Sequence, residues 1–130
     1  MLLEYLEDPD AQLHTRVLLL YDLAPDEVGV LRDAIERLSR GQCGDELQVH
    51  ALPGVVAVDG SSLVATVGET DLGVEPSTGA GLPFRCVLTP GAWQRACGLL
   101  EPFLLSGGQG FQYLTEVGPV EWIISHDRGW

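Results

Sequence analysis

The chain of 130 residues contains no lysine and no asparagine, and its seven basic residues are all arginines. Nineteen acidic residues oppose them and leave a formal net charge of −12. Binding to phosphates requires basic side chains that neutralise them, so we expect neither nucleic acid nor an anionic membrane surface as a partner. A basic protein surface suits this charge better.

Cysteine is scarce and the apolar runs are short. The three cysteines, Cys43, Cys86 and Cys97, form no C-x-x-C pair, and a secreted disulfide framework normally uses an even number. The longest strongly apolar run, Val17 to Tyr21, is too short to span a bilayer, and the amino terminus is acidic where a signal peptide is basic. We therefore expect a cytoplasmic protein of bacterial type with reduced thiols and no membrane association.

Patterns of catalytic or metal-binding residues are also missing. His14, His50 and His126 stand in no H-x-H, H-x-x-H or H-E-x-x-H spacing, so they do not predict a metal site. The glycine-rich stretch 106–110 ends a helical period, whereas a phosphate-binding loop opens a helix and usually carries lysine. The sequence predicts no catalytic residue, no metal and no cofactor, and it favours a protein that is not an enzyme.

What the sequence does contain is an order of structural signals that occurs twice, 65 residues apart. Pro25 and Pro90 each open a helical period, which is followed by a glycine-containing break and two extended stretches. Aligned without gaps, residues 16–60 and 81–125 share only four identities, about the number expected by chance. The similarity is one of layout, and it predicts two strand–helix–strand–strand units related by an approximate twofold axis.

Each predicted helix has one apolar stripe to bury. The first helix should begin at Pro25 and end at Arg40-Gly41, and the second should run from about 90 to 101 and kink or stop near Pro102. The stripes, at spacings of three and four, consist of Val28, Leu31, Ile35 and Leu38, and of Trp93, Cys97, Leu100 and Leu104. One stripe per helix indicates that each helix is covered on one side only.

The strand predictions rest on alternation and on turn residues. Strands are expected at 16–22, 47–52, 55–58, 62–67, 72–75, 84–88, 111–116 and 120–126. Asp59-Gly60 is the strongest hairpin signal and should join residues 55–58 to 62–67. Residues 1–13 are ambiguous: we expect a short helix there, and the alternative is an edge strand containing Tyr5.

These elements predict a single α+β domain over residues 1–130. A hairpin at 61–75 and a loop at 76–81 should join the units 16–60 and 81–125. The expected architecture is a single, mainly antiparallel mixed sheet of about six to eight strands with two main helices on one face. The alternative is a doubly wound sheet with a helix on each face. Segment 16–22 is apolar on both of its alternating faces, which favours that alternative, whereas the tight hairpins argue against it.

Few side chains stand out as candidates for binding. The set comprises His50, Arg85, His126, Asp127, Arg128 and Trp130. The terminal part of this set mixes His, Asp and Arg beside Trp, and its competing interpretation is a surface turn whose tryptophan packs on the sheet. Cys86 and Cys97 alternate with apolar neighbours and should be core residues, whereas Cys43 should be the exposed thiol.

The acidic residues favour a function in protein binding. Between Arg40 and Arg85 lie six acids and no base; the acids are Asp45, Glu46, Asp59, Glu69, Asp71 and Glu75. Our leading hypothesis is a non-enzymatic interaction domain that binds a partner protein through an acidic surface, as inhibitor or immunity proteins do, or that serves as an assembly subunit. Self-association through strand edges without lysine is a companion prediction.

A second hypothesis belongs to a different class. It is a small-molecule-binding protein or an enzyme, with its pocket between the two strand–helix–strand–strand units. The groups that would converge in such a pocket are His50, Arg85, Cys86 and His126.

Overall fold

The computed structural model describes residues 1–7, 16–42, 44, 46–105 and 110–127. Its class is α+β with mixed sheets, as predicted, and two α-helices lie within the described residues. The prediction of one sheet with six to eight strands is wrong, because the described strands form a five-stranded and a four-stranded sheet. None of the described helices is both long enough and apolar enough to cross a membrane.

The five-stranded sheet has a parallel pair at its centre and antiparallel pairs on both sides. Its order is β4 (Val56–Ala57), β1 (Leu2–Glu7), β2 (Arg16–Tyr21), β9 (Glu121–Ser125) and β8 (Phe111–Thr115). β2 is parallel to β9, while β1 and β8 run antiparallel to β2 and β9 respectively. β2 is apolar on both faces because each face is covered. Leu18 and Leu20 face the main core, and Val17 and Leu19 join Ile123 in a smaller cluster on the other face.

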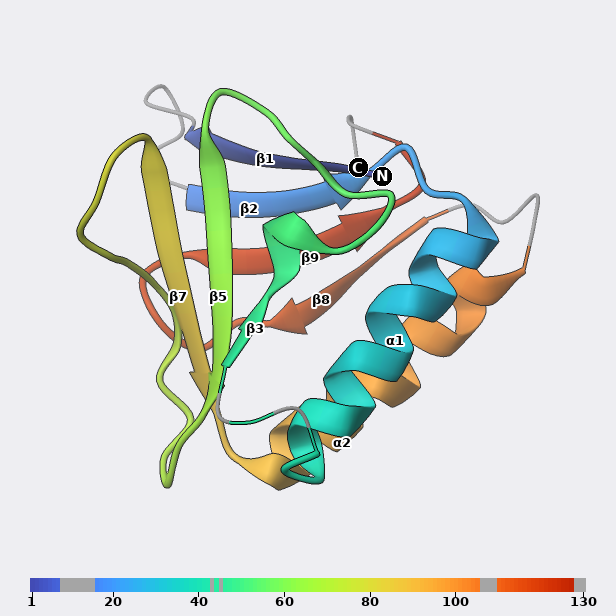
Figure 1. The fold of residues 1–130 in the computed structure, drawn as a ribbon. Helices are drawn as coiled ribbons and strands as arrows, with labels where there is room; N and C mark the ends of the chain where they lie inside the picture. Colours follow the sequence, from blue (N-terminus) through green and yellow to red (C-terminus); the bar gives the residue numbers. More distant parts are fainter. Residues whose placement is uncertain (8–15, 43, 45, 106–109, 128–130) are drawn as a thin grey trace.

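The four-stranded sheet repeats the arrangement of β1, β2, β9 and β8 but has no counterpart of β4, which pairs parallel to β1. Its order is β3 (Glu46–Gln48), β5 (Ser61–Val67), β7 (Leu82–Leu88) and β6 (Gly73–Pro76), with β5 parallel to β7 and antiparallel pairs outside. A 3₁₀ turn, η1 (Val49–Ala51), follows β3, so the strand predicted over 47–52 ends after Gln48. In Figure 1 the strands of this sheet run across the direction of β1, β2 and β9.

The two helices lie side by side and cover the open side between the two sheets (Figure 1). α1 (Pro25–Ser39) and α2 (Pro90–Leu100) both begin at the predicted prolines, and η2 (Glu101–Leu104) replaces the α-helix at Pro102 as its missing N–H requires. The predicted stripes are buried, apart from the partly buried Leu104, and they share one core cluster with the inner faces of both sheets.

The connections around the helices follow one scheme. β2 leads through α1 to the antiparallel pair β3–β5 in the other sheet, and β7 leads through α2 to the antiparallel pair β8–β9. By this topology β5 is the counterpart of β9 in the other unit. The ungapped alignment of the two units instead sets residues 55–58 opposite β9. The single domain over residues 1–130, with units 16–60 and 81–125, stays a prediction.

Two local predictions are wrong for the same reason. Leu2–Glu7 is a strand and not a short helix, because it pairs along its whole length with β2. Asp59 and Gly60 do form a turn with positive φ, 53° and 75°, but the turn does not close a hairpin. β4 before it pairs with β1, and β5 after it belongs to the other sheet. Pairing with distant strands overrides local propensity in both places.

The amino-terminal amine anchors β1 to α1. It lies 2.9 and 3.0 Å from the two carboxylate oxygens of Glu27 and 2.6 Å from the carbonyl of Gly54. In this ion pair the amino-terminal residue has a side-chain exposure of 0%, and the side chain of Glu27 is 28% exposed. Removing one charge from such a pair leaves the other without its counter-ion.

We expect Glu27→Gln to lower the free energy of unfolding by about 1–3 kcal/mol, because the amine keeps hydrogen bonds but loses its counter-ion. Urea denaturation at neutral pH measures the loss. Asp26→Asn is the matched control, since Asp26 is exposed in the same first turn and has no ion pair among the described residues. Equal losses in the two variants would contradict the anchoring role of Glu27.

Candidate functional site

The structure gives His50 a structural partner. The N–H of Leu63 in β5 donates to His50 Nδ1 over 3.2 Å, and this contact ties η1 to the four-stranded sheet. Arg85 lies exposed on the outer face of β7, opposite Glu75 of β6 in register. No ion pair joins Arg85 to Glu75. His50 thus connects η1 to β5, and Arg85 is exposed; a binding role of either residue stays a prediction.

The carboxyl-terminal candidates are only partly described. The His126 ring packs on Phe103 of η2 with 4.9 Å between the ring centroids, and the Asp127 N–H donates to the Ser125 hydroxyl. Arg128 and Trp130 lie outside the described residues, so their roles stay predictions. No hydrogen bond, ion pair or ring contact in the described part of the chain joins His50, Arg85 and His126.

The described thiols are core residues, as predicted. Cys86 is fully buried and Cys97 is 6% exposed. Burial raises the pKa of the Cys86 thiol, and the carboxylate of Asp71 adds to the rise. Burial also raises the pKa of Cys97, against a smaller lowering by Arg32. Both groups therefore stay protonated at neutral pH and are poor nucleophiles. Cys43 lies outside the described residues.

Metal binding has no support in the part of the chain that the structure describes, because no group of three or more His, Cys, Asp or Glu side chains converges there. Sites of this kind need several ligands at short distances from one point. The remaining candidates are a charged surface and a groove.

The charged surface lies on the four-stranded sheet and its turns. It consists of Glu46, Asp59, Glu69, Asp71 and Glu75, which we call the acidic surface. By register, Glu46 and Glu75 share the outer face with Arg85, since β3 pairs with β5 and β6 pairs with β7. Asp45, the sixth acid of the segment, lies outside the described residues.

No member of the acidic surface forms an ion pair with a described residue. Within the described part of the chain, one side-chain hydrogen bond reaches these acids, from the Thr89 N–H to Asp71 Oδ1 over 2.8 Å at the start of α2. Glu46, Asp59, Glu69 and Asp71 are exposed, and Glu75 is half-buried. The acidic surface therefore carries uncompensated negative charge.

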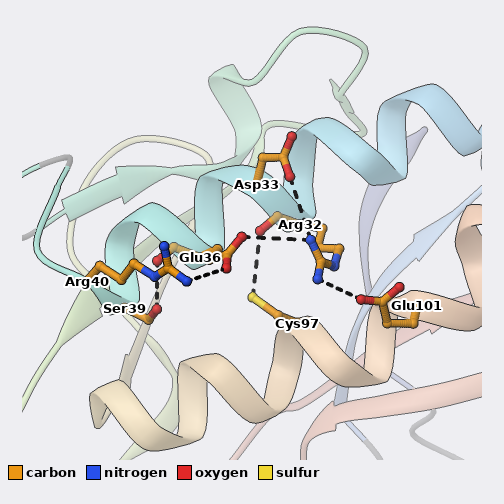
Figure 2. A network of polar contacts seen from close by, with 7 residues as sticks. All are labelled: Arg32, Asp33, Glu36, Ser39, Arg40, Cys97 and Glu101. Atoms are coloured by element: carbon orange, nitrogen blue, oxygen red, sulfur yellow. Dashed lines mark hydrogen bonds and ion pairs between the residues drawn. The ribbon is translucent and has the colours of Figure 1, made fainter.

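The acids between the helices are in the opposite situation. Arg32 reaches from α1 to Glu101 of η2, with 2.6 Å between Nη2 and Oε1, and lies 3.8 Å from Glu36. Arg40 pairs with Glu36 at 2.9 Å, and the Cys97 thiol donates to the Arg32 carbonyl (Figure 2). A hollow of about 350 Å³ lies beside this network. Its charges already neutralise one another, and pairs this exposed contribute less than about 1 kcal/mol each.

The groove lies between α2 and β8. Its volume is about 290 Å³. One wall is the helix face of Ala92, Arg95 and Leu99, and the other is the continuous stretch 112–117. Asp71 and Glu116 contribute carboxylates, and Leu88 contributes apolar surface. The groove therefore offers apolar contacts together with charges of both signs.

Sequence reasoning missed this groove, although one signal was present. Ala92, Arg95 and Leu99 repeat at spacings of three and four and form a second face of α2, beside the stripe of Trp93, Cys97 and Leu100. Arginine suits a helix face that is only partly covered by the rest of the protein, because its aliphatic stem packs on apolar groups while its charge stays in water. None of His50, Arg85, Cys86 and His126 lines either hollow.

Scanning the chain against protein-family models, curated proteins and solved structures finds no match in any of the three comparisons.

Proposed function

We propose that this protein is a non-enzymatic interaction domain that binds a partner protein through the acidic surface. One observation carries the proposal: the acids of the four-stranded sheet and its turns have no ion-pair partners among the described residues, whereas those beside α1 do. The five acids outnumber Arg85, which shares the outer face with Glu46 and Glu75. Such an excess of one charge raises the association rate of a partner with the opposite charge and discriminates against others.

The partner in this proposal presents a basic surface, as the target of an inhibitor or immunity protein does, or as a neighbouring subunit in an assembly does. The proposed compartment is the cytoplasm, with the buried free thiols of Cys86 and Cys97 as support. The raised pKa values of these two thiols also favour a protein without a nucleophilic cysteine at either position.

The alternative, a ligand pocket between the two units, has one observation in its favour. The 350 Å³ hollow lies between α1 and α2, which belong to different units. A ligand there would have to displace existing ion pairs of Arg32 and Arg40, so we favour protein binding.

The test is capture of a partner by two variants of equal charge. The immobilised chain is exposed to an extract of its source cells at low salt, and bound proteins are eluted with salt and identified by mass spectrometry. The first variant removes three charges of the acidic surface, by Glu46→Gln, Glu69→Gln and Glu75→Gln. The control removes three exposed charges elsewhere, by Asp22→Asn, Asp26→Asn and Asp33→Asn.

We expect the first variant to bind the eluted partner about tenfold more weakly than the control does, since three rim charges together contribute about 1.4 kcal/mol. The measurement is the dissociation constant of the purified partner at two salt concentrations. Equal affinity for the two variants, or the absence of any partner that salt elutes, would refute the proposal.

A further inference from the structure

β8 is the last strand of the five-stranded sheet. No described strand pairs with its outer edge, because its only recorded pairing is with β9. Natural sheets protect such edges with lysine, proline or bulges. β8 has neither lysine nor proline, and its register shift between Tyr113 and Thr115 is the single one of these devices present. An edge with no lysine, no proline and a register shift only at its carboxyl end keeps its first residues available to another strand.

The main-chain groups on this edge can be identified. Gly110 accepts a hydrogen bond from the His126 N–H, so this pair is a hydrogen-bonded pair of the β8–β9 ladder. Such pairs alternate with pairs whose main-chain groups point away from each other. The N–H and C=O groups of Phe111 and Tyr113 therefore point outward. The Gln112 side chain donates to the Tyr113 carbonyl over 3.2 Å, so an incoming strand would replace this contact at that oxygen.

A helix wall stands beside this edge, as Figure 1 shows for α2 and β8. The groove between them runs along residues 112–117, and Ala92 and Leu99 give its helix wall apolar side chains. Arg95 is exposed between them and has no ion pair within the described residues. A strand edge next to a helix provides main-chain hydrogen bonds and side-chain pockets together, which is what binding of an extended peptide requires.

We propose that the groove between α2 and β8 binds an extended segment of a partner protein, which adds as a strand to β8 and carries at least one lysine or arginine. Charge complementarity selects this occupant. In the groove the carboxylates of Asp71 and Glu116 outnumber the guanidinium of Arg95, and the chain as a whole has a net charge of −12. The inference deepens the proposed function and rests on it, because it assumes that the domain binds proteins.

Two other occupants fit less well. A second copy of this chain brings the same net charge of −12, and its own β8 is accompanied by its own α2. Pockets for small organic ligands are lined mainly by apolar and aromatic side chains, whereas Asp71, Arg95 and Glu116 place three charged groups in this groove. A single extended segment needs only room for its alternate side chains, because its backbone lies along the edge.

The test starts with a phage-displayed library of random twelve-residue peptides, selected on the native full-length protein. Synthetic copies of the enriched peptides are then titrated by fluorescence anisotropy against two variants at one position. Tyr113→Pro removes the outward N–H and leaves the bonds to β9 in place, while Tyr113→Ala removes the same side chain and keeps the N–H. The difference between them isolates the main-chain contact.

We expect the enriched peptides to contain lysine or arginine. Tyr113→Pro should bind them at least about tenfold more weakly than Tyr113→Ala does. Glu116→Gln should weaken binding about threefold and reduce its salt dependence, since Glu116 is exposed and the change preserves its shape. This third variant keeps the test valid where proline at position 113 disturbs the fold.

The proposal is overturned by any of three results. These are the absence of enriched peptides, equal peptide affinity of Tyr113→Pro and Tyr113→Ala, or a solution mass of two chains that falls to one chain in Tyr113→Pro. The last result assigns the edge to a second copy. A partner that the acidic surface binds and that Tyr113→Pro binds normally would end the groove proposal alone and leave the proposed function standing.

Discussion

Replacing Gly73 by alanine is expected to cost at least about 4 kcal/mol of the free energy of unfolding, which places it among the most damaging single substitutions. Gly73 has φ of 72°, and a Cβ built on it would lie 1.7 Å from the carbonyl oxygen of Val117. Positive φ alone costs a residue with a Cβ about 1–2 kcal/mol. The carbonyl belongs to the backbone, so no rotation of a side chain relieves the contact.

This contact joins the two sheets. Val120 donates its N–H to the Val74 carbonyl over 3.2 Å, and the turn between β8 and β9 lies against the start of β6. A Cβ built on Gly118, at φ of 93°, would lie 2.7 and 2.9 Å from the carbonyl oxygens of Leu72 and Val74. A methyl group on Gly73 must therefore push the β8–β9 turn away from β6, at the place where the bond between Val120 and Val74 joins the two sheets. A domain of this size has only about 5–15 kcal/mol of stability in total.

Gly98→Ala is the matched control for Gly73→Ala. Gly98 lies within α2, and nothing stands within 4 Å of a Cβ added there. Alanine in place of glycine should raise the free energy of unfolding by about 0.5–1 kcal/mol, because the unfolded chain loses conformational freedom. Urea denaturation followed by circular dichroism measures both variants. Denaturation midpoints that agree within error would show that the closeness of Gly73 to Val117 has no energetic consequence.

The sequence predicts the helices well because their signals are local. Pro25 and Pro90 set both starts, Pro102 sets the end of α2, and the apolar spacing identifies the buried faces. Thr89 caps α2, with its side chain accepting from the Ala92 N–H. Each of these signals depends on residues within one or two turns of the chain, so no knowledge of distant partners is needed.

The number of sheets was not predictable by the same reasoning. Alternation identifies which side chains of a strand are buried, but the inner faces of both sheets face one shared core. β5 and β9 therefore have the burial pattern of strands in a single sheet. The Asp59-Gly60 signal was real as a turn, and nothing local shows that the chain changes sheets there.

The candidate site divides in the same way. The acidic surface was predictable, because a run of acids without a base is visible in the sequence and the described ones are at least partly exposed. The groove was not, because Asp71, Arg95 and Glu116 come together only when α2 packs beside β8. The hydrogen bond between His50 and Leu63 was not predictable either, because it depends on the 3₁₀ turn η1, which interrupts the expected strand.

Replacing Trp93 by alanine is the second change with a large expected effect. Trp93 is fully buried, packs edge-on against Trp122 with 6.2 Å between ring centroids, and donates its indole N–H to the Thr66 carbonyl over 2.9 Å. Truncation should cost about 3–5 kcal/mol, as for other buried aromatic side chains. A loss below about 1 kcal/mol in a denaturation experiment would mean that the core refills the space.

The two tryptophans also allow the hydrogen bond to be measured apart from the packing. Both are fully buried, but Trp122 Nε1 has no hydrogen-bond partner among the described residues, while Trp93 Nε1 bonds to Thr66. Phenylalanine at either position loses similar volume, and only at position 93 does it leave a carbonyl without its donor. We therefore expect Trp93→Phe to cost about 1–3 kcal/mol more than Trp122→Phe. Denaturation of the two variants and of the double variant tests this, and equal costs would assign the effect of Trp93 to packing alone.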